Sequence, residues 1–351
     1  MKEIARISLK PGMVIGADIF NYQNKLVVTE GTQVNPNIIN KLARHSIVSV
    51  PIKEELARAL TYSEKIRSSK GFTSFQRVYR LVLPIYRKIT EDLVSGKIPF
   101  SGDQLMDIYG RIYESLPSHE SLLDYLYNME FRESEKMYTH GINCALVAGL
   151  FGSWLSFSKE KTRLLALGGF LHDIGIFKLP EALVSNTGTL SELANEKLKT
   201  HTFTGFELLQ KLNGEDSVLK AALMHHERYD GTGYPSRLHD KQIDIYARCM
   251  AVVDAYEAML SAPSSQQAGN PFQAITHFEK DASGYDPELL HSILCGLANH
   301  MVGFPVLLSN GQVGEVLAIS PKELTRPLVR TGDGSFIDLA SHKNLTIKGF
   351  Y

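Results

Sequence analysis

Cysteine is scarce in this sequence, and features typical of secreted proteins are missing. Only three cysteines occur in 351 residues, at Cys144, Cys249 and Cys295, and no two of them form a CxxC pair. A disulfide framework or a structural zinc site is therefore not expected, and a reducing cytoplasm is the predicted environment. The N-terminus alternates polar and apolar residues instead of presenting a charged segment followed by an apolar one, so no secretory signal is expected.

Neither sign of charge dominates the sequence. Its 37 basic and 38 acidic residues give a formal net charge of -1. Surfaces that bind DNA, RNA or anionic membranes carry an excess of basic residues. We therefore expect no nucleic-acid partner, and any nucleotide that the protein handles is expected to be small.

Charged residues are also absent from one long segment, residues 137–158. About 20 mostly apolar residues are enough to span a membrane. This segment, however, contains His140, Asn143 and three glycines, and polar residues disfavour insertion into lipid. We interpret it as a buried core helix and expect no membrane span.

Hydrophobic patterns predict a mainly α protein with β-rich ends. The composition, 44% hydrophobic and 21% charged, is that of an ordinary globular protein. Strand-like residues 25–34 precede one short helix that begins at Asn35 and Pro36, and helical spacing then prevails. Near the end, Asn-Gly and Asp-Gly pairs lie between apolar runs, which is typical of hairpins. The predicted parts are a small β-rich domain (1–52), a helical connector (53–115), a helical core (116–300) and a small β module (301–351).

Candidate metal ligands are concentrated in the predicted helical core. An apolar helical run ends at adjacent His172 and Asp173, whose imidazole and carboxylate can contact one metal ion or two. His201 lies four residues before Gly205, so a position without a side chain follows one helical turn later. Each feature alone has a structural alternative, because His-Asp pairs arise by chance and a single histidine is more often a capping or surface residue.

A second group of candidate ligands follows in the segment "HHERYDGTGYP", which begins at His225 and His226. Neighbouring helical side chains diverge by about 100°. The two histidines therefore suit two ions, or an ion and a substrate, better than a single ion. Asp254 lies among alanines on a later helix, where a buried carboxylate without a partner would be unfavourable. A nearby cation would remove this difficulty.

In order and spacing, these residues resemble the HD-GYP subgroup of the HD phosphohydrolase superfamily. The resemblance covers about residues 130–299, and Gly233, Tyr234 and Pro235 match the GYP signature. It implies an all-helical HD-type core that hydrolyses the bacterial messenger cyclic di-GMP to pGpG, GMP or both by a metal-bridged hydroxide. It also implies a ligand set, with Asp173 as the bridge between two ions: His140, His172, Asp173, His201, His225, His226 and Asp254.

The resemblance further implies roles around the metal ions. Histidine and carboxylate ligands favour transition ions, and we expect iron or manganese. Glu227 and Asp230 either orient ligands or cap the turn, and both alternatives stay open. The predicted catalytic residues are Asp173, His201, Glu227 and Asp230. The predicted substrate contacts are Lys178, Gly233, Tyr234 and Pro235.

Three departures from the family pattern concern phosphate binding. The lysine of the family's HDIGK motif is Ile176 here, and Lys178 lies two positions later. The family's Arg-Pro-Tyr segment is replaced by "SAPSSQQAG" from Ser261, and its Lys-Pro-Gly stretch by residues 186–188. An isoleucine cannot replace a cation. Metal binding should survive these changes, but phosphate affinity is in question.

Several functions therefore stay open. The first is an active cyclic di-GMP phosphodiesterase. The second is a degenerate HD-GYP domain that binds a nucleotide or a signalling protein with little turnover, and the third is an HD phosphohydrolase with another nucleotide substrate. A homodimer also stays open. Some family members bind a third ion through a glutamate four residues before the first histidine. That residue is Lys136 here, so we expect two ions.

Overall fold

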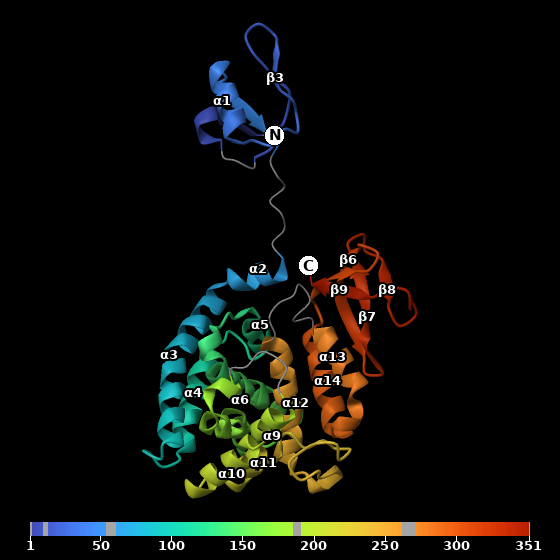
Figure 1. Ribbon diagram of the computed structural model, residues 1–351. Helices are drawn as coiled ribbons and strands as arrows, with labels where there is room; N and C mark the ends of the chain where they lie inside the picture. The colour runs from blue at the N-terminus through green and yellow to red at the C-terminus, as the bar shows by residue number, and fades with distance from the viewer. Residues whose placement is uncertain (1, 10–12, 54–60, 185–190, 262–270, 351) are drawn as a thin grey trace. The chain divides into compact units, whose positions relative to one another are not determined.

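The computed structural model describes residues 2–9, 13–53, 61–184, 191–261 and 271–350 (Figure 1). The chain divides into two compact units, Met1–Leu60 and Thr61–Tyr351. Three stretches discussed above lie outside the described residues: the start of the predicted connector (54–60), the altered Lys-Pro-Gly stretch (186–188) and the segment that follows Ser261. The predicted division into four parts stays a prediction.

The described residues of the smaller unit form two antiparallel strand pairs, one α-helix and a short 3-10 turn, η1 (Arg6–Ser8). β1 pairs with β4, and β2 pairs with β3. The helix begins as predicted, because Asn35 accepts a hydrogen bond from the backbone N–H of Ile38 at 3.0 Å and thereby caps it. Ile15, Leu42 and Val50 are fully buried in the unit's own core. The elements are β1 (Lys2–Ala5), β2 (Ile19–Phe20), β3 (Leu26–Val28), α1 (Pro36–Arg44) and β4 (Ser49–Ile52).

The larger unit is mainly helical. A short 3-10 turn, η3 (Ile174–Lys178), follows helix α7 and contains Ile176. The helices are α2 (Tyr62–Arg67), α3 (Lys70–Val94), α4 (Gly102–Glu114), α5 (Ser121–Asn128), α6 (Lys136–Trp154), α7 (Lys159–Leu171), α8 (Glu181–Val184), α9 (Glu192–Lys199), α10 (His201–Lys211), α11 (Asp216–Met224), α12 (Ile245–Ser261), α13 (Pro271–Lys280) and α14 (Pro287–His300).

Helix α6 forms the centre of the helical core. Residues 141–152 are buried on every side of the helix, as expected where apolar residues are not confined to one stripe. The prediction of a buried core helix is therefore confirmed. None of the helices in the described part of the chain has the length and apolar character that a bilayer crossing requires.

Helices α6 and α7 approach each other closely at Gly169. A Cβ atom at Gly169 would lie 2.5 Å from both the Cα and the N of Ala145, which is too close for any side chain. Next to this contact, the hydroxyl of Tyr86 on α3 donates a hydrogen bond to the carbonyl of Phe170 at 2.5 Å. The glycine thus sets the distance between the helix that carries His140 and the helix that ends before His172.

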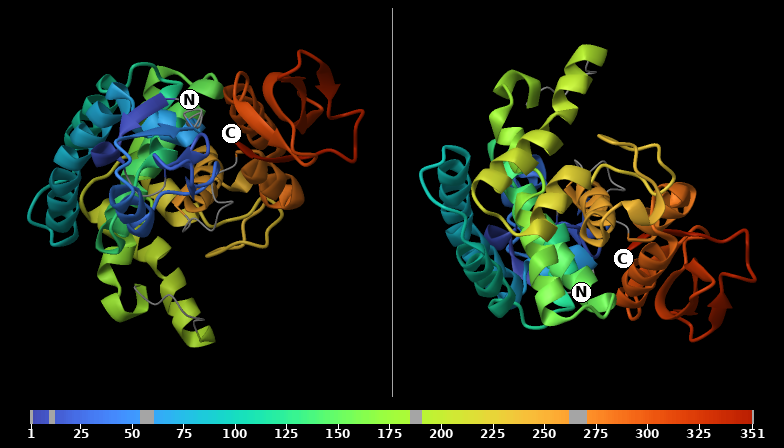
Figure 2. Two further views of the ribbon diagram at one scale, coloured as in Figure 1. Left: turned by 90° about the horizontal axis from the view of Figure 1, so that it is seen from above. Right: turned by 90° about the horizontal axis from the view of Figure 1, so that it is seen from below.

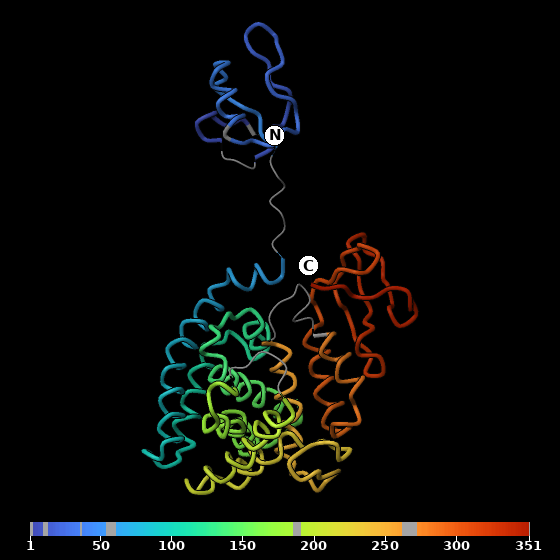
Figure 3. Tube along the Cα trace, viewed as in Figure 1, coloured from blue at the N-terminus to red at the C-terminus, as the bar shows by residue number. Residues whose placement is uncertain are grey.

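A five-stranded antiparallel sheet follows α14, and Figure 3 traces this last part of the chain in red. Its order is β8-β7-β6-β5-β9. Gly311 and Gly334, in the predicted hairpin turns, both have a φ of 85°, which glycine adopts readily. The strands are β5 (Pro305–Leu308), β6 (Val313–Ser320), β7 (Glu323–Thr331), β8 (Phe336–Asp338) and β9 (Ile347–Phe350).

The sheet lies on one flank of the helices in both views of Figure 2, against α13 and α14. Val306, Val316 and Val329 point into the same hydrophobic core as the helices and are fully buried. The predicted fold class, mainly α with small β-rich ends, is confirmed. The sheet therefore extends the helical core, whereas all of the predicted metal ligands lie on helices and the loops between them.

Replacing Gly169 tests whether the close contact between α6 and α7 determines stability. Gly169→Ala should lower the free energy of unfolding by about 1–3 kcal/mol, because the added methyl group must displace the backbone of α6. Gly110→Ala on α4 is the matched control, since no atom lies within 4 Å of its added Cβ. Chemical denaturation of both variants checks this. Equal stability of Gly169→Ala and the unchanged protein would contradict the account.

Candidate metal centre

The seven predicted ligands come from separate elements and meet at one place. His140 lies on α6 and Asp254 on α12, whereas the others lie at helix ends. His172 and Asp173 directly follow α7, and His201 is the first residue of α10. His225 and His226 directly follow α11. Helix ends allow adjacent residues to turn toward a common point, which the middle of a helix does not allow.

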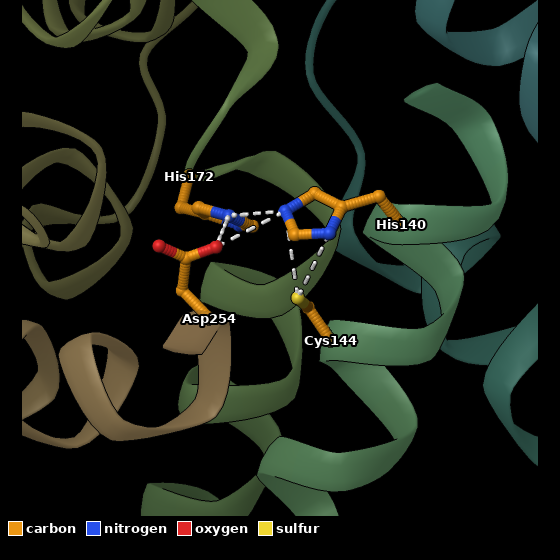
Figure 4. Close-up of side chains that lie close together, drawn as sticks. All are labelled: His140, Cys144, His172 and Asp254. Carbon is orange, nitrogen blue, oxygen red and sulfur yellow. Dashed lines mark hydrogen bonds and ion pairs between the residues drawn. The ribbon is translucent and has the colours of Figure 1, made fainter. Parts of the chain in front are cut away.

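The first group of ligand atoms lies around His140 (Figure 4). Nε2 of His140 is 3.2 Å from Nε2 of His172 and 3.3 Å from Oδ1 of Asp254. One potential ligand atom of each residue, together with the sulfur of Cys144, lies within 4.8 Å of all the others in the group. These side chains could hold one cation.

The second group lies around His201 and includes His225, His226 and Asp173. Nε2 of His201 is 3.3 Å from Nε2 of His225. Oδ1 of Asp173 lies 3.2 Å from Nε2 of His201 and 3.4 Å from Nε2 of His225. Again the four ligand atoms lie within 4.8 Å of one another, so a second cation fits here.

Asp173 lies between the two groups. Its Oδ1 faces His201 and His225, while its Oδ2 is 3.6 Å from Nε2 of His140 and 3.8 Å from Nε2 of His172. A carboxylate can bind one ion with each oxygen. The geometry therefore suits the bridging role that the resemblance implies for Asp173.

In His172, His201 and His225, hydrogen bonds determine which ring nitrogen can bind a metal. Nδ1 of His172 donates to the carbonyl of Gly169 at 3.0 Å, and Nδ1 of His201 donates to the carbonyl of Leu198 at 2.7 Å. Nδ1 of His225 donates to the carbonyl of Ala221 at 3.0 Å. A carbonyl only accepts, so the proton of each neutral ring is on Nδ1 and the lone pair is on Nε2.

This arrangement fits a metal and is unfavourable without one. The facing Nε2 atoms cannot hydrogen-bond to each other when both carry lone pairs. Oδ1 of Asp173 is buried and has no hydrogen-bond partner of acceptable geometry among the described residues. Buried acceptors that face only acceptors lack compensation for lost water. A cation in each group would satisfy all of them.

The pKa shifts agree with this reading for His172 and His226 but not for all of the rings. Burial lowers the pKa of His172 to about 4, and burial together with His225 lowers the pKa of His226 to about 2. Burial alone would raise the pKa of Asp173, but the surrounding imidazoles outweigh it and hold that pKa well below its usual range. Asp254 behaves in the same way because of His140. Neutral imidazoles and ionised carboxylates are the forms that bind metal.

Burial is outweighed at His140 by Cys144, Asp254 and Glu257, which raise its pKa well above the usual value, and at His201 by Asp173, which raises its pKa. A metal ion therefore competes with a proton at these two rings.

Glu257 is a functional candidate that sequence reasoning missed. Its carboxylate is buried and accepts a hydrogen bond from Nδ1 of His140 at 2.6 Å and another from Nδ2 of Asn143 at 2.8 Å. The hydroxyl of Ser261 also donates to it. Carboxylates that hold the far nitrogen of a histidine orient it toward a metal. Its place three residues after Asp254, on the same side of α12, is the signal that could have revealed it.

Cys144 is another neighbour that was not predicted as a ligand. Its sulfur lies 3.8 Å and 3.7 Å from the two nitrogens of the His140 ring. Burial raises the pKa of the Cys144 thiol to about 12. The side chain is therefore a protonated thiol against the edge of the ring in the protein without metal. Its spacing of one helical turn from His140 is visible in the sequence.

Glu227 and Asp230 are bonded within the loop that contains the GYP residues. Glu227 accepts hydrogen bonds from the backbone N–H groups of Ser236 at 2.7 Å and Leu238 at 3.0 Å. Oδ1 of Asp230 accepts from the hydroxyl of Thr232 at 2.6 Å. These contacts shape the loop, and neither carboxylate belongs to the two groups of metal ligands found among the described residues. Their catalytic roles stay predictions.

The predicted substrate contacts lie in two places. Gly233, Tyr234 and Pro235 line a pocket of about 710 Å³, and the Tyr234 ring stacks on the His226 ring with 4.7 Å between centroids. Gly233 packs so closely on the loop that a Cβ there would lie 2.5 Å from Cα of Glu227. Lys178 is exposed at the end of η3, and it is not among the described residues that line this pocket.

Comparison with known proteins identifies this part of the chain. A family model for the HD domain matches residues 125–289. Residues 125–289 are thus similar to HD domains. That segment holds every predicted metal ligand, and the predicted resemblance to HD-GYP proteins is confirmed.

Several curated relatives are similar to this chain. Cyclic di-GMP phosphodiesterase PA4108 of Pseudomonas aeruginosa is 30% identical over 226 residues, which are 64% of this chain and 54% of that protein. The response regulator RpfG of Xanthomonas campestris, also named a cyclic di-GMP phosphodiesterase, is 34% identical over 155 residues, or 43% of this chain and 41% of that protein. The chain thus spans about half the length of the curated relatives it matches.

Two further comparisons extend this set. A protein of Vibrio cholerae named 3'3'-cGAMP-specific phosphodiesterase 1 is 28% identical over 198 residues, which are 56% of this chain and 43% of that protein. Among solved structures, Bd1817, an HDG"Y"P protein from Bdellovibrio bacteriovorus, matches with a TM-score of 0.45 at 16% identity. The match covers 83% of this chain and 97% of that one.

Metal content tests the two ligand groups directly. The purified protein should hold close to two transition ions per chain, and His172→Ala and Asp173→Ala should each lose most of them because metal affinity depends on the complete ligand set. His291→Ala, an exposed histidine of α14 outside both groups, is the control and should keep its metal. Elemental analysis after gel filtration gives the count. Full occupancy in both ligand variants would rule out this site.

Glu257→Gln tests whether the carboxylate orients His140. The amide keeps the shape but removes the negative charge beside Nδ1, and such changes typically weaken metal affinity about tenfold to a hundredfold. Competition with a chelator measures the affinity. Glu207→Gln, an exposed change on α10, serves as the control and should leave affinity unchanged. Equal metal affinity of Glu257→Gln and the unchanged protein would mean that Glu257 serves only packing.

Proposed function

We propose that the chain is a metal-dependent phosphodiesterase that hydrolyses cyclic di-GMP to pGpG, GMP or both. The observation that carries the proposal is the pair of ligand groups with Asp173 between them. The HD domain and the curated relatives named as cyclic di-GMP phosphodiesterases support it. The proposed ligands are the seven predicted ones, His140, His172, Asp173, His201, His225, His226 and Asp254.

The donor set favours transition ions, and we propose iron or manganese. Imidazole suits such ions, whereas magnesium and calcium prefer sites built mainly of oxygen. When bound, a pair of such ions activates water at neutral pH and takes up charge that develops on phosphoryl oxygens. The histidine and carboxylate ligands in the sequence had suggested this choice, and the five imidazoles that meet in the two groups support it.

The remaining chemistry belongs to residues of the chain. Asp173 and Asp254 are ionised and offset the positive charge of the ions. Backbone carbonyls and Glu257 hold the histidine rings at fixed angles, so little reorganisation is needed when substrate arrives. Tyr234 stacks on the His226 ring and also lines the neighbouring pocket. Catalytic roles for Asp173 and His201 follow from their position in this proposal.

A binding module with little turnover is the second candidate. The observation that favours it is Ile176, which is half-buried in η3 where the family has a lysine, while Lys178 points from an exposed position. Both proposals, the active enzyme and the binding module, include the same two groups of proposed metal ligands. The relative named for 3'3'-cGAMP keeps another cyclic dinucleotide open as a substrate.

We also propose a cytoplasmic location and leave the oligomeric state to experiment. Cys144, Cys249 and Cys295 are all free thiols, which suits a reducing compartment. A homodimer or a signalling protein is the proposed macromolecular partner.

Product analysis separates these candidates. The purified chain is loaded with Mn(II) or, without oxygen, with Fe(II), and incubated with cyclic di-GMP or 3'3'-cGAMP. We expect linear pGpG or GMP from cyclic di-GMP, and none from the Asp173→Ala variant. Protein that holds two ions and binds cyclic di-GMP without forming product would favour the binding module. Cleavage of 3'3'-cGAMP alone would assign the other substrate.

A further inference from the structure

A pocket of about 710 Å³ lies beside the metal groups and carries two cations that the family motifs do not include. It is formed by the end of α9, the first turn of α10 and the loop of residues 231–237. Lys199 and Arg237 contribute the cations, and Phe203 and Tyr234 contribute aromatic rings. We call it the Lys199–Arg237 pocket.

Tyr234 forms a shared wall between this pocket and the metal centre. One side of its ring stacks on the His226 ring at 4.7 Å between centroids, with 30° between the planes. The ammonium of Lys199 lies 5.4 Å from the centroid of the same Tyr234 ring. A ligand that begins at the metal groups and extends past Tyr234 therefore reaches Lys199 next.

The two cations are available to an anionic ligand. Lys199 forms an ion pair with Glu196 at 2.6 Å, and the Lys199 side chain is 34% exposed against 63% for Glu196. Such exposed pairs contribute little stability, so a phosphate can displace the carboxylate. The guanidinium of Arg237 has no carboxylate partner among the described residues, and its planar fork can bind a phosphate through two hydrogen bonds.

The aromatic rings suit a nucleobase. Phe203 is 54% exposed at the pocket, although large apolar side chains are usually buried. Bases stack on exposed aromatic rings, and stacking tolerates different bases because each has a flat π-face. A pocket with two cations, the exposed ring of Phe203 and the partly buried ring of Tyr234 therefore matches a nucleotide better than an acidic peptide.

We infer that the Lys199–Arg237 pocket holds the second phosphate and one base of a cyclic dinucleotide whose reacting phosphate lies at the metal groups. This inference rests on the proposed function and names further substrate-binding residues for it. The two cations provide the phosphate contact that is missing at Ile176. Substrate affinity is thereby preserved by residues outside the GYP signature.

Charge-neutral variants test the pocket. Lys199→Gln and Arg237→Gln should each raise KM for cyclic di-GMP about tenfold to a hundredfold, the effect of losing a charge-assisted hydrogen bond. The turnover number should change little, because these cations contact the phosphate equally in the bound substrate and in the transition state. Metal content should also change little, because neither residue is a proposed metal ligand. Lys197→Gln is the matched control, since Lys197 lies on the same helix, is exposed and is not among the residues that line the pocket.

Glu196→Gln provides a change in the opposite direction. Removing the carboxylate that competes for Lys199 should lower KM and tighten the binding of cyclic di-GMP. Calorimetry on the metal-loaded protein with a non-hydrolysable phosphorothioate analogue of cyclic di-GMP measures binding without turnover, and the Phe203→Leu variant should bind this analogue more weakly because an aliphatic side chain gives less stacking. A general loss of folding would lower the melting temperature of the variants and is checked at the same time.

The outcomes separate this inference from the proposed function. If the unchanged protein hydrolyses cyclic di-GMP while Lys199→Gln and Arg237→Gln keep its KM, the pocket is not a substrate site and the proposed function stands. If the protein binds cyclic di-GMP without turnover and both variants lose binding, the pocket is supported and the proposed activity is wrong. If the unchanged protein neither binds nor hydrolyses cyclic di-GMP, both are wrong.

Discussion

The metal centre depends on the direction in which the histidine lone pairs point. Backbone carbonyls accept hydrogen bonds from Nδ1 of His172, His201 and His225. The carboxylate of Glu257 accepts one from Nδ1 of His140. The Nε2 atoms are left facing one another and facing Asp173. In a protein interior such facing acceptors are unfavourable unless a cation lies among them, or a proton on His140 or His201, whose pKa values the neighbouring carboxylates raise. Hydrogen bonds that do not involve a metal therefore orient these rings in a way that suits a cation.

The helical core maintains this arrangement through close packing. Gly169 lets α7 lie directly against α6, and its carbonyl also accepts a hydrogen bond from Nδ1 of His172. The same residue therefore sets the helix separation and the orientation of a ligand. On the far side of His140, the chain Tyr79, Asn143 and Glu257 continues the hydrogen bonding into the core, with 2.7 Å between Tyr79 Oη and Asn143 Oδ1. Packing and ligand geometry are consequently linked.

The fold class and the proposed ligands were predicted from different features of the sequence. Periodicity and turn residues predicted helices and hairpins, because Asn35 caps a helix and Gly311 and Gly334 adopt positive φ in tight turns. The ligands followed from motif spacing through a family resemblance. The spacing could not show that the two oxygens of Asp173 face different groups, because that depends on how five segments pack.

Other features of the site were not predicted, and the contacts that define them are long-range. Glu257 meets His140 only through the packing of α12 on α6, a separation of 117 residues. Lys199 and Arg237 meet around Tyr234 from a helix and a loop that carry no shared motif. The strands of the last sheet also join the core of the helices, a packing contact that the sequence pattern does not reveal.

The most direct test of the central claim is anomalous diffraction from crystals of the metal-loaded protein, measured above and below the absorption edge of the bound metal. The account predicts two peaks. One should lie among His140, His172 and Asp254, and the other among His201, His225 and His226, with an oxygen of Asp173 directed at each. A single peak, or peaks bound by other residues, would contradict it.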